Sequence, residues 1–190
     1  MNRLATLLFA AVIGTSSSAR AEHRWEIDPE RSTITFAYTL FGSPAAGAFE
    51  AMRGSGRFRA SAPEATVFSL EIAVDSLDLG QTLINAYALS AEWFDAAKHP
   101  TARYRLSRLR IDDRGQAWAL GDLTLKGTQI IFETPVTLDI GADEARASGA
   151  MIFERTDFGI GVGPTALLVD LHDEVEVRFD LIATPADPGN

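Results

Sequence analysis

The sequence predicts an all-β domain of antiparallel strands, arranged as a barrel or a sandwich. Three segments, 32–40, 67–74 and 173–182, alternate apolar and polar residues with the period of two that a half-buried strand shows. Short turn sequences, such as DDRG at 112–115 and GADE at 141–144, separate candidate strands. Short strands in series are typical of antiparallel sheets that close on themselves or stack in pairs.

Each of the three alternating segments has one apolar face. These faces consist of Ile34, Phe36, Tyr38 and Leu40 in the first segment, Phe68, Leu70, Ile72 and Val74 in the second, and Val175, Val177, Phe179 and Leu181 in the third. The opposite faces carry Thr, Glu, Arg and Asp, so each strand has a wet side and a dry side. A closed sheet of about eight strands satisfies this pattern, and its interior is either filled by side chains or able to hold one small apolar ligand. The alternation alone leaves both outcomes open.

Four further segments complete the predicted strands: 102–111, 116–127, 130–140 and 145–154.

One stretch departs from strand periodicity. Between Asp78 and Pro100, Leu83, Tyr87 and Phe94 recur at helical spacing in a segment rich in Ala and Leu, which predicts a short helix. This helix must end before Pro100, because proline disfavours helical geometry at the preceding residue.

The first 21 residues have the features of a secretory signal peptide. A basic start at Arg3 is followed by an apolar run from Leu4 to Ile13, and Ala19 and Ala21 form an A-x-A cleavage site. The apolar run is shorter than the roughly 20 residues that a bilayer-spanning helix needs. We therefore expect a signal peptide at 1–21 and one mature domain at 22–190, located in the periplasm or secreted.

Charge and cysteine content restrict the possible partners. The full chain has a formal net charge of −9, and without the leader 15 basic residues remain against 26 acidic ones. Phosphate-rich surfaces attract basic clusters, which this chain lacks, so we expect neither nucleic-acid binding nor stable membrane insertion. There is no cysteine, which excludes disulfides, thiolate metal sites and cysteine nucleophiles.

The sequence offers few groups for catalysis. The three histidines, His23, His99 and His172, have no metal-binding spacing, so we expect no metal and no cofactor. No G-x-S-x-G motif is present, and Pro100 draws His99 out of helical register with Asp95. We therefore expect a protein that is not an enzyme.

Arg155 is the most informative polar residue, because it ends an apolar strand within ERTDFG at 154–159. A buried charge needs a partner. Two interpretations stay open: an ion pair within the chain with Asp157 or Glu154, or a contact with the polar head of a ligand.

Several segments together resemble the YceI-like family of secreted, lipocalin-like lipid-binding proteins. The resemblance rests on WEIDPERSTITF at 25–36, GAF at 47–49, WFDAAKHP at 93–100, GDLTLKG at 121–127 and RTDFGI at 155–160. These motifs occur in the order that the family shows and cover nearly the whole mature chain. The resemblance implies an eight-stranded antiparallel barrel with a short helix near one mouth. It also implies a long apolar pocket for an isoprenoid, an isoprenoid quinone or a fatty-acyl amide.

On this basis we expect apolar and aromatic side chains to line the ligand pocket. The candidate lining residues are Phe36, Tyr38, Leu70, Ile72, Tyr87, Phe94, Tyr104, Leu123, Phe132, Phe153, Phe158 and Val177. Three positions depart from the family pattern: Arg31 and Lys126 stand where histidine is frequent, and Asn85–Leu89 lacks the charged residues usual there. These departures suggest a ligand with a less charged end.

Three other interpretations remain at this stage. A barrel with a filled core would serve a structural or interaction role without a ligand. An outer-membrane barrel would need lipid-facing bands of about 9–11 residues and aromatic girdles. An enzyme acting on lipid would need a site built from residues such as Asp95, His99, Arg155 and Asp157. The protein partners and the oligomeric state are not predicted.

Overall fold

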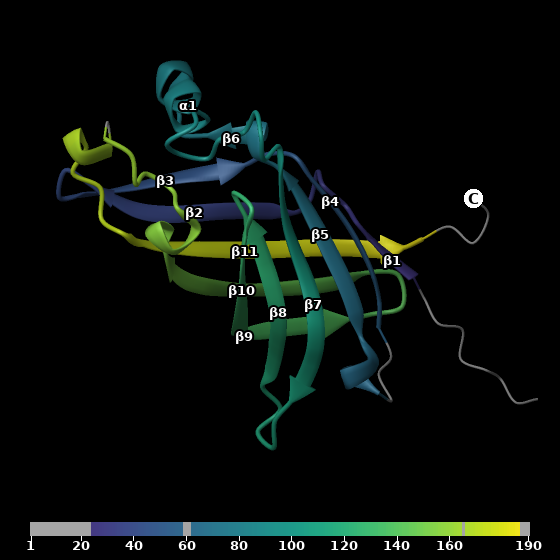
Figure 1. Ribbon diagram of the computed structural model, residues 1–190. Coiled ribbons are helices and arrows are strands. Elements are labelled where there is room, and N and C mark those ends of the chain that lie inside the picture. Colours follow the sequence, from purple (N-terminus) through teal and green to yellow (C-terminus); the bar gives the residue numbers. More distant parts are fainter. Residues whose placement is uncertain (1–23, 59–61, 165, 187–190) are drawn as a thin grey trace, which may run out of the picture.

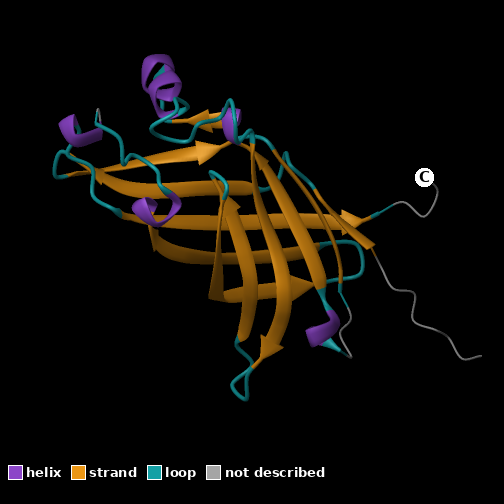
Figure 2. Cartoon of the chain, in the orientation of Figure 1, coloured by secondary structure: helices purple, strands orange, loops and turns teal. Residues whose placement is uncertain are grey.

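The computed structural model describes residues 24–58, 62–164 and 166–186. It is mostly strand, with one α-helix and four short 3-10 helices in these ranges (Figures 1 and 2). The strands are β1 Arg24–Ile27, β2 Thr33–Leu40, β3 Ser43–Phe49, β4 Met52–Arg57, β5 Val67–Ala73, β6 Leu77–Asp78, β7 Thr101–Ile111, β8 Ala117–Leu125, β9 Thr128–Ile140, β10 Ala145–Glu154 and β11 Glu174–Pro185. The helices are α1 Thr82–Ala88, η1 Pro63–Ala65, η2 Val74–Ser76, η3 Arg155–Phe158 and η4 Ala166–Leu168.

The sheet closes into an eight-stranded antiparallel barrel. Its ring runs β1-β4-β5-β7-β8-β9-β10-β11, and β11 returns to pair with β1. Strands β2, β3 and β6 extend the sheet from β11 on the side of α1. The all-β antiparallel barrel predicted from the sequence is thus confirmed.

Strands β1 and β2 act as one interrupted strand, because both pair with β11. The interruption is stabilised by Ser32, whose hydroxyl accepts a hydrogen bond from the Ile182 amide at 2.9 Å and donates to the Ile182 carbonyl at 3.3 Å. The Asp28 amide also donates to that carbonyl, at 2.8 Å. The two bonds of the hydroxyl give a structural reason for the serine in the first motif.

The predicted helix is shorter than its sequence pattern suggested. Helix α1 ends at Ala88, and the chain continues to Pro100 in turns. Asp95 has a φ of +47°, which a right-handed helix does not allow, and the Phe94 amide donates back to Ala88. Placing Phe94 on the helix was therefore wrong. The helix lies at one end of the barrel, above the β2–β3 pair (Figure 1).

Glycines in β3 and β4 permit close packing of each strand against its own neighbours, β2 for β3 and β5 for β4. A Cβ on Gly47 would lie 2.5 Å from the Phe36 ring, and one on Gly54 would lie 2.7 Å from the Ser69 carbonyl oxygen. These two strands were not predicted, because SPAAGAF and MRGSGR carry little alternation of large apolar side chains.

Candidate ligand cavity

An apolar cavity of about 200 Å³ lies inside the barrel. It extends from the middle of the barrel to the rim opposite α1, where the β9–β10 turn and the ends of β4 and β11 meet. Its lining comprises Trp25, Ile27, Ile34, Gly56, Arg57, Phe58, Thr66, Val67, Phe68, Leu70, Ile72, Tyr104, Leu106, Leu109, Ala119, Leu123, Thr134, Val136, Leu138, Ile140, Ala145, Arg146, Ala147, Met151, Val177, Phe179, Leu181 and Ala183. The cavity is partly enclosed and can take a hydrocarbon chain.

Few polar side chains contribute to this lining. Tyr104, on β7, is partly buried, and burial, with a smaller contribution from the Asp122 carboxylate, raises its pKa to about 12. Its ring lies over Gly121 of β8, where a Cβ would overlap the phenol oxygen. The tyrosine therefore stays neutral in the physiological pH range, and its hydroxyl depends on a glycine in the neighbouring strand for space.

An ion pair stands at the rim of the cavity. Arg146 of β10 contacts Asp180 of β11 through both carboxylate oxygens, with its Nε 2.7 Å from Oδ1. This hydrogen bonding lowers the pKa of Asp180 and raises that of Arg146. The positive charge of Arg146 is therefore compensated within the barrel wall.

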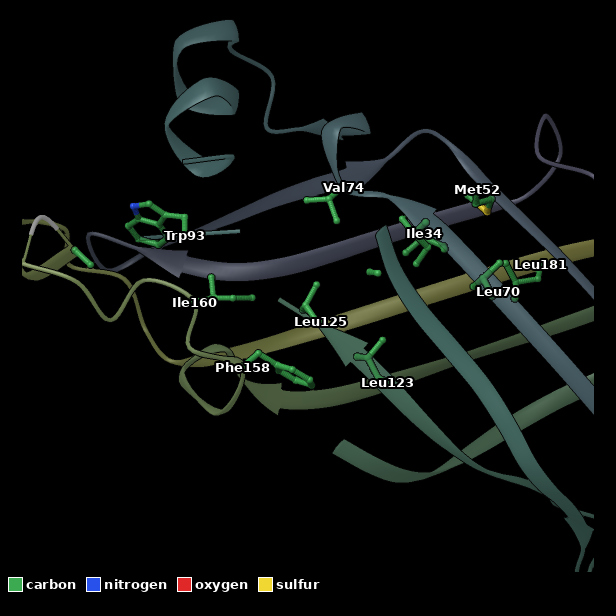
Figure 3. Close-up of a cluster of buried hydrophobic side chains, with 13 residues drawn as sticks. Ile34, Met52, Leu70, Val74, Trp93, Leu123, Leu125, Phe158, Ile160 and Leu181 are labelled. Atoms are coloured by element: carbon green, nitrogen blue, oxygen red, sulfur yellow. The ribbon is translucent and has the colours of Figure 1, made fainter. Parts of the chain in front are cut away.

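Buried side chains gather at the end of the barrel beside α1, where Figure 3 shows Trp93, Ile160 and Phe158. Phe158 is 1% exposed, and its ring centroid lies 5.1 Å from that of Phe153 and 6.4 Å from that of Phe132. Trp93 is buried at the same end, where its ring meets Tyr87. The interior thus has a packed end and a hollow end, so neither simple alternative describes the whole barrel.

The twelve candidate lining residues divide between these two ends. Those that line the cavity are Leu70, Ile72, Tyr104, Leu123 and Val177. Those outside its lining are Phe36, Tyr38, Tyr87, Phe94, Phe132, Phe153 and Phe158. Phe49 contacts the rings of both Phe36 and Phe94, and Phe36 also contacts Tyr38. Phe132 and Phe153 contact each other in a separate group of rings. A role in ligand binding stays a prediction for the first group, and the second is placed to stabilise the barrel.

Some cavity residues were not among the candidates. Phe68 and Phe179 were assigned to inward strand faces, so the alternation could have identified both. Trp25 lies on a strand of four residues, too short for a periodic signal. Ala119 and Ala147 leave space rather than fill it, and no sequence pattern distinguishes such an alanine from any other.

Arg155 holds the packed end together. Its five N–H donors go to the carbonyls of Ile160, Gly161, Leu171 and His172, at 2.7–3.2 Å, and to Asp173 at 2.7 Å. The predicted ion pair with Asp157 or Glu154 is wrong, because the backbone turns at η3 and brings Asp173 to the guanidinium instead. With every donor used, Arg155 has none left for a ligand head.

Lys126 makes a second link at this end. Its ammonium donates to the Glu92 carbonyl at 3.0 Å and to the Gly159 carbonyl at 2.6 Å. Burial lowers the pKa of Lys126. The side chain therefore ties the loop after η3 to the segment that follows α1.

Two other features complete the description of the site. Within the described ranges, no three His, Cys, Asp or Glu side chains are grouped so that they could hold a metal ion. None of the helices in these ranges has the length and apolar content that crossing a bilayer requires.

A closed antiparallel barrel with an apolar cavity open toward one rim is the architecture of lipocalin-like proteins. Residues 25–183 match the YceI-like domain, and the chain belongs to this family. Its curated relatives include UPF0312 proteins of Pseudomonas savastanoi pv. phaseolicola and Azotobacter vinelandii, each 26% identical. These alignments cover 88% and 90% of this chain, and 91% and 94% of the relatives.

Solved structures show the same fold. Burkholderia cenocepacia BcnA is 26% identical, with a TM-score of 0.76 over 83% of this chain and 99% of that one. A polyisoprenoid binding domain from Saccharophagus degradans, implicated in plant cell wall breakdown, is 15% identical. It has a TM-score of 0.69 over 85% of this chain and 98% of that domain. At that identity the second likeness supports the fold alone.

Proposed function

We propose that the mature chain, residues 22–190, is a periplasmic or secreted protein that binds an amphiphilic lipid in the barrel cavity and carries or stores it. The ligand classes are an isoprenoid, an isoprenoid quinone or a fatty-acyl amide. The observation that supports this proposal is the apolar cavity of about 200 Å³ that reaches one rim of the barrel. The Saccharophagus degradans domain is described as polyisoprenoid binding, and we extend that property to this chain as part of the proposal.

Binding of this kind needs no catalytic group. Moving a hydrocarbon tail out of water gains roughly 25 cal/mol for each Å² of apolar surface removed. The apolar walls of the cavity include Leu70 on β5, Leu123 on β8 and Val177 on β11. We expect reversible binding without turnover.

Export rests on the sequence of the leader, which lies outside the described residues. Cleavage after Ala21 would leave a mature chain that begins at Glu22. Recovery of this chain from a periplasmic extract, with the mass that corresponds to residues 22–190, is the expected result. A chain that retains residues 1–21 and stays in the cytoplasm would contradict it.

The proposal is tested by native mass spectrometry with solvent extraction, on mature protein purified without detergent. We expect a stoichiometric lipid whose class the extract reveals. Ala147→Trp places a large ring in the cavity, because Ala147 lines it, whereas Ala37→Trp adds the same ring at an exposed position. Loss of lipid from Ala147→Trp alone supports the cavity as the site.

Two outcomes would contradict the proposal. In the first, the wild-type protein stays empty even when it is offered quinones, polyprenols and acyl amides, which favours the structural or interaction role. In the second, folded Ala147→Trp and Ala37→Trp retain equal amounts of lipid, which places the ligand elsewhere. Circular dichroism of each variant confirms that the barrel is intact before retention is compared.

A further inference from the structure

One buried hydroxyl in the cavity lining lacks a hydrogen-bond partner. Among the described residues, two buried side-chain polar atoms are in this state: Thr66 Oγ1 and Trp93 Nε1. Trp93 lies in the packed end, with Tyr87 against its ring and the Arg155 guanidinium 5.8 Å from its centre. Thr66 lines the cavity. Native structures pair nearly all buried polar groups, so an unpaired one in a ligand cavity points to a partner supplied by the ligand.

The local fold holds Thr66 at the mouth end of the cavity. Residues Pro63–Ala65 form the 3-10 turn η1, and the Thr66 amide closes it by donating to the Pro63 carbonyl at 3.0 Å. The side chain is 8% exposed. The next residue, Val67, pairs with Arg57, the last residue of β4. The hydroxyl is therefore fixed close to the rim, while the cavity continues inward to Leu123 and Met151.

The charges around the cavity indicate an uncharged ligand head. Two arginines contribute to the lining: Arg146, which forms an ion pair with Asp180, and Arg57, which is exposed. The full chain is acidic, with a net charge of −9. Because Asp180 already compensates Arg146, that arginine does not offset the cost of burying a diphosphate or carboxylate head beside it.

We propose that Thr66 determines ligand specificity by donating a hydrogen bond from its hydroxyl to a carbonyl oxygen on an uncharged lipid. The apolar tail of the lipid then runs inward along the cavity. This inference rests on the proposed lipid-binding function and deepens it. A neutral carbonyl satisfies the buried hydroxyl, whereas a hydrocarbon without oxygen leaves it unpaired.

Thr66→Val removes the hydroxyl and keeps the shape of the side chain, and Thr66→Ser restores a hydroxyl. Thr134→Val is the matched control, because Thr134 is also buried and lines the same cavity but its hydroxyl is not among the unpaired buried atoms. The probes are farnesylacetone, its hydrocarbon analogue without the ketone oxygen, and farnesyl diphosphate. Tryptophan fluorescence reports binding, since Trp25 lines the cavity.

We expect the wild-type protein to bind the ketone more tightly than the hydrocarbon. Thr66→Val should lower affinity for the ketone by about 2- to 12-fold, the range of one net hydrogen bond, and leave affinity for the hydrocarbon unchanged. Thr66→Ser and Thr134→Val should keep the wild-type preference.

Three results would overturn the assignment: an unchanged preference in Thr66→Val, an equal loss in Thr134→Val, or tightest wild-type binding to farnesyl diphosphate. In each of these the protein still binds a lipid, so the proposed function survives. A wild-type protein that binds none of the three probes overturns the assignment, and the proposed function falls with it only if quinones, polyprenols and acyl amides also fail to bind.

Discussion

Replacement of Phe158 by alanine tests whether the packed end of the barrel carries its stability. The side chain is 1% exposed, and its ring contacts those of Phe153 and Phe132. Replacing a buried phenylalanine by alanine costs about 3–5 kcal/mol, and aromatic pairs add about 0.5–1.5 kcal/mol beyond the buried area. We therefore expect Phe158→Ala to lower the free energy of unfolding by about 4–5 kcal/mol.

Phe68→Ala is the matched control at the hollow end, because Phe68 is only partly buried and lines the cavity. Full burial of a phenylalanine is worth about 1.5–3 kcal/mol, so we expect this variant to lose about 1–2 kcal/mol. Urea unfolding of the mature chain, followed by tryptophan fluorescence, measures both values. Equal losses in the two variants, or a loss below about 2 kcal/mol for Phe158→Ala, would refute the reasoning.

Three further predictions concern single side chains. Burial raises the pKa of Tyr104 to about 12, so the contribution of the neutral tyrosine to stability is intact below the ordinary value of 10.0 and is lost as the pH rises toward 12. In an absorbance titration, Tyr104→Phe should therefore lack the last phenolate step, and an unchanged titration would contradict this. Lys126→Met removes two hydrogen bonds from the ammonium to backbone carbonyls, so hydrogen exchange of the Gly161 amide, in the loop that Lys126 holds, should become about 10-fold faster. Unchanged exchange would show that these two bonds do not hold the loop. Gly121→Ala should lower the free energy of unfolding, measured in a thermal melt, by about 1–3 kcal/mol. The added Cβ would overlap the Tyr104 hydroxyl and lie 2.7 Å from the Arg105 carbonyl oxygen, so an unchanged melt would contradict this close packing.

The long alternating strands were predictable from the sequence, because their pattern is local. The strand predicted at 32–40 appears as Thr33–Leu40, with Ile34 buried and the residues two and four positions later turned to the same side. Strands β3 and β4 were not predictable in this way. Their glycines are required by neighbours that are distant in the sequence, as Gly54 is by Ser69 of β5. A pattern read from a short stretch of the sequence does not show which distant residue will lie against a glycine.

The candidate site was predicted in part, for a related reason. Phe36 and Val177 are direct partners on neighbouring strands, yet Val177 lines the cavity and Phe36 packs beside Phe49. Alternation shows that both side chains point inward, but not how far along the barrel axis each side chain reaches. That depth depends on the register and tilt of all eight strands, and on side-chain size across the barrel. Arg155 shows the same limit, since its acidic partner is 18 residues away along the chain.

The alanines in the cavity wall determine how long the empty part of the barrel interior is. Ala119, Ala145 and Ala147 line the empty part of the interior, where larger side chains would shorten the space along the axis. The ring contacts of Phe132, Phe153 and Phe158 lie at the other end and do not depend on these positions. Cavity length can therefore change by substitution at the three alanines while the fold is kept. Within one architecture, the size of a few small residues sets the length of the empty space.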